Sequence, residues 1–175
     1  MNLREAILEE HSRQQVSRIV QWIGANTGRI AALIDIFCHD EYRVVQRAAW
    51  IVSDVARQHP ELMLPHIPAL VQRLEDDNTH IAVKRNVYRV MQYLELPEAV
   101  HAPLMNSCFD SLANPREALA VRAFAMSILA RLALVYPEIG HELKLLIEDN
   151  LLQEPAPSFK SRARKVLQQL EKHIR

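Results

Sequence analysis

Apolar residues recur along most of this chain at the spacing of amphipathic helices. Within residues 41–58, for example, Val45, Ala48, Val52 and Val55 fall on one helical face. Prolines lie almost entirely between such periodic segments, where they begin or end helices. Only three glycines are present, too few for a Gly-rich phosphate loop or for many hairpin turns. The pattern therefore predicts an all-α chain and argues against an all-β or Rossmann fold.

Two sequence markers divide these helices into repeats. The first is a set of four arginines that are 38, 37 and 40 residues apart: Arg47, Arg85, Arg122 and Arg162. The second is a Pro-Glu pair that keeps the same period, at Pro60-Glu61, Pro97-Glu98 and Pro137-Glu138. A period of about 40 residues with two helices per unit is typical of helical solenoids, in which each unit buries its apolar face against its neighbours.

The length and composition favour a single domain over residues 1–175. The chain has 175 residues, 49% of them apolar, which is enough to bury a sizeable core. We expect an N-terminal capping segment, in which Ser12 and Gln15 form a capping box at the start of a helix. The predicted boundaries are a cap at 1–26 and repeats at about 27–59, 60–96, 97–136 and 137–175.

One segment is similar to the second helix of a HEAT repeat. Residues 40–56, DEYRVVQRAAWIVSDVA, place an Asp in the turn before a helix with Val, Arg and paired alanines. The chain resembles the HEAT-repeat, armadillo-like family over about residues 28–174. This resemblance implies a right-handed α-α superhelix of about four helical hairpins. HEAT and armadillo units intergrade, and the sequence leaves that subclass open.

The resemblance also implies an internal ladder of hydrogen-bonded Asp and Arg side chains. Asp40 and Asp77 would bond toward Arg47 and Arg85. Asn114 stands where the third Asp is expected, before Arg122. A repeated arginine can also contact a ligand, although a structural role is the more usual one for such a position.

The charges separate by helix layer although the formal net charge is zero. Taken as residues 41–58, 79–93, 115–134 and 158–173, the second helices carry 14 basic and 4 acidic residues, a net charge of +10, so the remainder carries −10. Second helices line the concave side of HEAT solenoids, so the resemblance implies a basic inner face. Such a face can steer an acidic partner.

Positions three, seven and ten residues after each repeated Arg lie near its helix face and supply candidate contacts. Trp, Tyr and Arg are the types that most often anchor interfaces. The alternatives are that Trp50 and Tyr88 pack between repeats, and that the basic residues of the last helix only face solvent. The candidate partner-binding residues are Arg43, Trp50, Asp54, Arg57, Tyr88, Arg89, Gln92, Arg162 and Lys165.

Motifs for catalysis and for metal or cofactor binding are missing. No two histidines are four residues apart, and neither cysteine has a His in a pattern that suggests an activated thiolate. Gly-x-Ser-x-Gly and phosphate-loop patterns are absent. We therefore predict a non-catalytic scaffold with no cofactor and no metal, which holds an acidic segment of a protein partner.

A nucleic-acid alternative remains open at this stage. Trp50 and Asp54 share a helix face, which resembles part of the site of DNA glycosylases built from HEAT-like repeats. Those enzymes bind DNA in a basic concave groove and act in the repair of alkylated DNA. The neutral overall charge and the short length count against this function.

Two further expectations concern assembly and location. From residue 118 to residue 136 only Arg122, Ser127 and Arg131 are polar, so this helix is apolar nearly all round. That pattern predicts burial in the middle of a stack or, as a further alternative, a homo-dimer through residues 118–136. No stretch has the features of a signal peptide or a membrane span, which favours a cytoplasmic protein.

Overall fold

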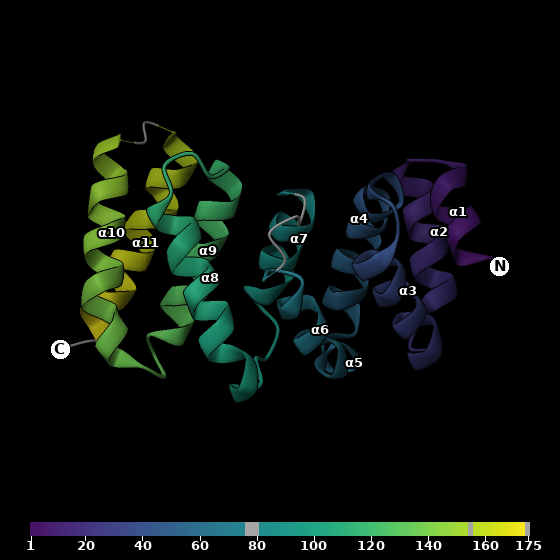
Figure 1. Ribbon diagram of the computed structural model, residues 1–175, viewed down its shortest axis with the longest axis horizontal. Helices are drawn as coiled ribbons and strands as arrows, with labels where there is room; N and C mark the ends of the chain where they lie inside the picture. The colour runs from purple at the N-terminus through teal and green to yellow at the C-terminus, as the bar shows by residue number, and fades with distance from the viewer. Residues whose placement is uncertain (76–80, 154–155, 174–175) are drawn as a thin grey trace. The chain divides into compact units, whose positions relative to one another are not determined.

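The computed structural model describes residues 1–75, 81–153 and 156–173 (Figure 1). Every regular element within these ranges is a helix and none is a strand, which confirms the all-α prediction. The chain divides into two compact units, Met1–Val100 and His101–Arg175. The single domain with its cap and four repeats remains a prediction.

The first unit holds seven α-helices and two short 3-10 turns in its described residues. The turns are Leu64–His66 and Glu98–Val100. The helices are α1 (Leu3–Glu9), α2 (Arg13–Ile23), α3 (Thr27–His39), α4 (Tyr42–Gln58), α5 (Pro60–Met63), α6 (Ile67–Gln72) and α7 (Ile81–Met91).

The described residues of the second unit hold four helices of 13 to 17 residues, drawn from green to yellow in Figure 1. A 3-10 turn at Pro137–Ile139 leads into the third of them. In its described residues these helices are α8 (His101–Ala113), α9 (Leu119–Leu132), α10 (Gly140–Gln153) and α11 (Pro157–His173).

The predicted capping box begins helix α2. The Ser12 hydroxyl accepts a hydrogen bond from the Gln15 backbone N–H at 3.1 Å, which satisfies one of the donors left open at a helix N-terminus. The helix ends at Gly24, whose φ of +50° is rarely adopted by residues with a Cβ. The Gln15 side chain reaches back to the Ala6 carbonyl at 2.7 Å and ties α2 to α1.

Helix α4 forms the centre of the first unit. It packs against α1, α2, α3 and α7. Its buried face includes Val44, Ala48, Val55 and Ala56, none of which is exposed. Because two of these residues are alanines, neighbouring backbones can approach closely there. The apolar stripe predicted for this segment is therefore the core of the unit.

Helix α9 has the same place in the second unit. It packs against α8, α10 and α11, and Val121, Ala125, Met126 and Leu129 are fully buried. Cover by three helices of its own unit explains why this segment is apolar nearly all round. The large apolar side chains that stay exposed in 118–136 are Leu134 and Val135. A homo-dimer through this segment remains a prediction.

Candidate functional site

The repeated arginine of α4 binds a helix end rather than an aspartate. Arg47 Nη1 donates hydrogen bonds to the carbonyls of Leu8 at 2.8 Å and of Ile7 at 3.4 Å, in the last turn of α1. These carbonyls have no partner within the helix, and a cation stabilises the negative end of the helix dipole. Arg47 is therefore a C-terminal cap for α1.

Asp40, the predicted ladder partner of Arg47, pairs with Arg4 instead. Arg4 Nε and Nη2 donate to the two carboxylate oxygens of Asp40 at 2.8 and 3.0 Å. The hydrogen bond from Arg4 lowers the pKa of Asp40 below its ordinary value. The predicted Asp40–Arg47 pair is wrong, because α1 supplies both the carbonyls that bind Arg47 and the arginine that binds Asp40.

Arg122, the repeated arginine of α9, is buried in the second unit with only 5% of its surface exposed. Its Nε donates to Asn150 Oδ1 at 3.0 Å, and its Nη2 bonds the same oxygen. Asn150 Nδ2 in turn donates to the Leu112 carbonyl at 3.1 Å and to the Leu146 carbonyl at 2.7 Å. This network joins α8, α9 and α10 and satisfies the polar groups that the fold buries there.

Asn114, which was predicted to pair with Arg122, has a local role. Its side-chain oxygen accepts from the Arg116 backbone N–H at 3.0 Å, as Asn does in turns. The ladder prediction is wrong here too, and the partner that it missed is Asn150. The sequence does contain a signal for it, because Asn150 lies on one face of α10 with the buried residues Leu143 and Ile147.

The third predicted ladder pair cannot be compared with the structure. Asp77 lies outside the described residues, and Arg85 is exposed on α7. Their pairing remains a prediction.

Arg162, the repeated arginine of α11, is half-buried and oriented by α9. Its Nη1 donates to the Ser127 hydroxyl oxygen at 3.0 Å, and its guanidinium lies 5.5 Å from the centre of the Phe124 ring. The Ser127 hydroxyl donates to the Ala123 carbonyl at 3.2 Å. The guanidinium of Arg162 thus has a hydrogen-bond partner and an aromatic neighbour on α9.

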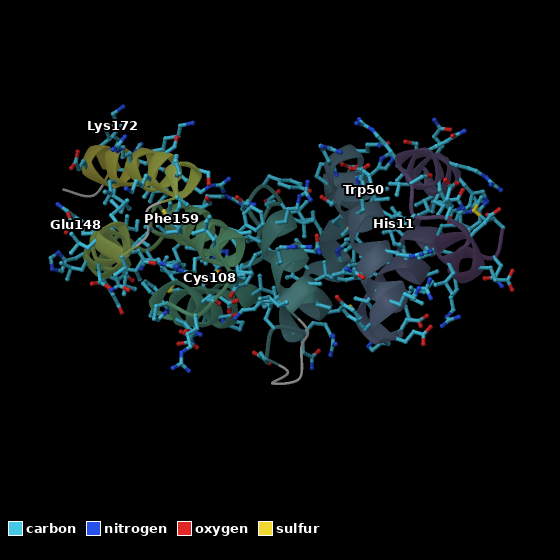
Figure 2. All side chains as sticks on the ribbon, turned by 90° about the horizontal axis from the view of Figure 1, so that it is seen from above. His11, Trp50, Cys108, Glu148, Phe159 and Lys172 are labelled. Carbon is cyan, nitrogen blue, oxygen red and sulfur yellow. The ribbon has the colours of Figure 1, made fainter. Side chains whose placement is uncertain are left out.

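An open groove of about 490 Å³ lies between α9 and α11 beside this arginine. Its wall on α11 is one helical stripe from Ser158 to Gln169. Phe159 of the same helix is buried in the unit (Figure 2). None of the described lining residues is acidic. The lining of this α9–α11 groove is Ser127, Ala130, Ser158, Ser161, Arg162, Lys165, Val166 and Gln169.

A second hollow, of about 520 Å³, lies on another side of α11 and shares two residues, Ser161 and Lys165, with the groove. Its described lining also lacks acidic residues and adds Lys160 and Arg164. Basic side chains thus surround much of α11. Lys172 projects outward near the end of the same helix (Figure 2).

The predicted contact residues on α4 are partly engaged within the first unit. Trp50 is half-buried and meets His11 edge to face, with 6.1 Å between the ring centres (Figure 2). Asp54 and Arg57 form an ion pair with each other. The structure therefore places the Trp50 and Asp54 side chains among partners of their own, while Arg43 is exposed.

The predicted residues on α7 divide between core and surface. Tyr88 has an exposed fraction of 0%, so its prediction as a contact residue is wrong and its alternative role in packing holds. Arg89 is exposed. Gln92 follows α7, is half-buried and donates to the Arg89 carbonyl at 3.1 Å.

The described residues do not form a metal-binding cluster, since no three His, Cys, Asp or Glu side chains gather among them. Cys38 and Cys108 are buried free thiols. Burial raises the pKa of Cys38 to about 11, which keeps this thiol protonated at neutral pH, whereas a reactive thiolate has a lowered pKa. Among the helices of residues 1–75, 81–153 and 156–173, none has both the length and the hydropathy of a membrane span.

A sequence profile described as HEAT repeat domain matches residues 3–170. The chain belongs to the HEAT repeat family. This match and the all-helical structure confirm the predicted family and fold class. No curated protein and no solved structure shows significant similarity to the chain. Members of the HEAT repeat family are helical repeat scaffolds that commonly mediate protein interactions and are generally non-catalytic.

Proposed function

We propose that this HEAT repeat protein is a non-catalytic scaffold that holds an acidic segment of a protein partner in the α9–α11 groove. The observation that carries the proposal is the lining of the groove, where Arg162 and Lys165 stand among neutral residues and no described lining residue is acidic. A concave site lined by one sign of charge raises the local concentration of an oppositely charged ligand and speeds its association.

The volume of the groove is large enough to hold part of a ligand such as one or two side chains of a peptide. Its volume of about 490 Å³ lies in the range of ligand pockets, about 300–1,000 Å³. The apolar contribution comes from Ala130 and Val166, which lie among the polar residues of the lining. A peptide bound in an extended conformation can place some of its side chains in such a groove, while its acidic side chains contact the cations of the lining.

The arrangement on α4 does not favour the glycosylase alternative. A base-excision site needs a carboxylate and aromatic surface that are open to an extruded base. Asp54 is instead engaged by Arg57, and Trp50 packs against His11. DNA binding is therefore not proposed, and the test below includes duplex DNA as a competing ligand.

The test is a fluorescence anisotropy titration with a short fluorescein-labelled peptide of Asp and Glu. We expect binding that weakens as salt increases, because the attraction is between exposed charges. Lys165→Glu should weaken it at least about tenfold, a loss of about 1.4 kcal/mol. Arg13→Glu is the matched control, because it reverses an exposed charge on α2 in the other unit and should change the affinity less than about twofold.

Three outcomes would overturn the proposal. The first is an absence of peptide binding at low salt. The second is an equal loss in Lys165→Glu and Arg13→Glu, which would reduce the interaction to general charge attraction. The third is a mobility shift with plain or alkylated duplex DNA that is stronger than the peptide signal at the same salt concentration.

A further inference from the structure

The α9–α11 groove contains more than positive charge. Ser158, Ser161 and Gln169 add neutral side-chain donors to the cations Arg162 and Lys165. A carboxylate offers two acceptor oxygens and one negative charge. A phosphate monoester on a side chain offers three acceptor oxygens and a charge of about −1.5 to −2 at neutral pH. The groove therefore has a richer set of donors than a carboxylate requires.

The guanidinium of Arg162 is set up for planar recognition. The Ser127 hydroxyl oxygen accepts from its Nη1 at 3.0 Å, and its Cζ lies 5.5 Å from the centre of the Phe124 ring. An arginine held in this way loses less side-chain freedom on binding than a solvated lysine does. Arginine also binds phosphate oxygens through parallel N–H groups, which adds geometric specificity to the charge attraction.

The hydroxyls and cations of α11 share one helical face. Ser158 is four residues before Arg162, and Ser161 is four residues before Lys165, so each hydroxyl lies one turn from a cation. All four line the groove. Ser158 and Ser161 also belong to the first turns of a 17-residue helix, where the helix dipole is positive and favours an anion.

We infer that the α9–α11 groove recognises a phosphorylated serine or threonine within the acidic segment, with Arg162 as the specificity-determining residue. Lys165, Ser158 and Ser161 contact the remaining phosphate oxygens, and Gln169 contacts the flanking segment. This inference rests on the proposed function, because it names the chemistry of the segment that the same groove holds. It makes partner binding dependent on a kinase acting on the partner.

The first experiment compares three versions of one labelled acidic peptide, with serine, phosphoserine or glutamate at its centre. The phosphoserine peptide should bind at least about tenfold more tightly than the serine peptide, since charge-assisted hydrogen bonds are roughly twice as strong as neutral ones. The glutamate peptide should fall between them. In ³¹P NMR, the second pKa of the phosphate should decrease on binding, because the cations favour the dianion.

The second experiment distinguishes the planar hydrogen-bond donors of Arg162 from its positive charge. Arg162→Lys keeps the positive charge but removes the planar set of donors. We expect the preference for phosphoserine to fall to about threefold or less, while affinity for the serine peptide changes by less than about twofold. Arg164→Lys on the same helix is the control. It lines the second hollow rather than the groove and should keep the full preference.

The outcomes distinguish this inference from the proposed function. If the serine and phosphoserine peptides bind equally, the inference is wrong and the proposed function stands. If neither peptide binds, both are wrong. If phosphoserine is preferred but the preference is unchanged in Arg162→Lys, the phosphate binds elsewhere and the assignment to this groove is overturned. Circular dichroism of each variant should match the parent protein. If Arg162→Lys does not fold, Lys165→Ala takes its place. Its criterion is the loss of the phosphoserine preference alone, because removal of its charge also weakens binding of the serine peptide.

Discussion

Helix α4 of the first unit and helix α11 of the second are both basic, but their charges have different surroundings. On α4, Arg47 binds the carbonyls that end α1, and Arg57 pairs with Asp54. On α11, Arg162 and Lys165 line a groove whose described residues include no carboxylate. The comparison shows that the net charge of a helix does not reveal which of its cations border an open hollow. The local balance of charges around a hollow is more informative.

The repeated arginines differ in the same way. Among three of the four, Arg122 is buried and binds Asn150, and Arg47 is half-buried and binds backbone carbonyls. Arg162 is half-buried, binds Ser127 and lines the α9–α11 groove. A buried guanidinium must be satisfied by the protein itself, whereas one at a groove can also bind a ligand. The same position of the repeat thus serves stability in α4 and α9 and, in our proposal, recognition in α11.

The largest expected effect comes from breaking the buried network of the second unit. Asn150→Ala removes the side chain that accepts from Arg122, and a buried charge is left without that acceptor. We expect the free energy of unfolding to decrease by about 3 kcal/mol, measured by urea denaturation.

Asn114→Ala is the matched control for Asn150→Ala, because the ladder prediction assigned the same role to Asn114. Asn114 is exposed and holds only a turn, so its loss should cost less than about 1 kcal/mol. Equal losses in the two variants would contradict the assignment of Asn150 as the partner of Arg122.

A smaller effect is expected from Arg47→Ala in the first unit. The variant loses the hydrogen bonds to the Leu8 and Ile7 carbonyls, which should cost about 1–2 kcal/mol. Hydrogen exchange should become faster in α1. A double-mutant cycle between Arg47 and Asp40 should give a coupling energy near zero. A clearly favourable coupling energy would support a direct Asp40–Arg47 pair and contradict the structure.

The smallest effect concerns the exposed pair of Arg4 and Asp40. Because Arg4 lowers the pKa of Asp40 in the folded protein, the unfolded state takes up a proton first as the pH falls. The stabilisation is therefore fully present above the ordinary Asp pKa of about 3.9 and is lost as the pH falls through the lowered value.

Arg4→Gln tests this pH dependence by thermal unfolding. The parent protein should have a slightly higher Tm than the variant at neutral pH, and the two values should converge in acid and in high salt. A difference that stays constant with pH would show that Arg4 acts through packing rather than through Asp40.

The helices and their class could be predicted because periodicity is a local property of the sequence. The apolar stripe of α4 and the capping box of α2 appear where they were expected. The partners of the repeated arginines could not be predicted from the sequence, because they come from other helices that the fold brings close. Arg47 binds α1, a helix of only seven residues that the pattern did not indicate, and Arg122 binds an asparagine from a different helix pair.

The candidate site was predicted in part for a related reason. Arg162 and Lys165 line the groove, but Tyr88 was placed three residues from Arg85 on the assumption of a shared exposed face. Three positions turn a helix by about 300°. That turn brings Tyr88 onto the buried stripe of Val87 and Met91. The serines of the groove were missed because single hydroxyls on a basic helix form no periodic pattern.

The most direct test of the account compares the two units with one labelled acidic peptide. Arg162→Ala/Lys165→Ala and Arg43→Ala/Arg89→Ala each remove two positive charges, the first pair from the α9–α11 groove and the second from exposed positions on α4 and α7. We predict a loss of affinity of at least about tenfold for the first double variant and of less than about twofold for the second. Equal losses, or a larger loss in the second, would contradict the groove as the binding surface.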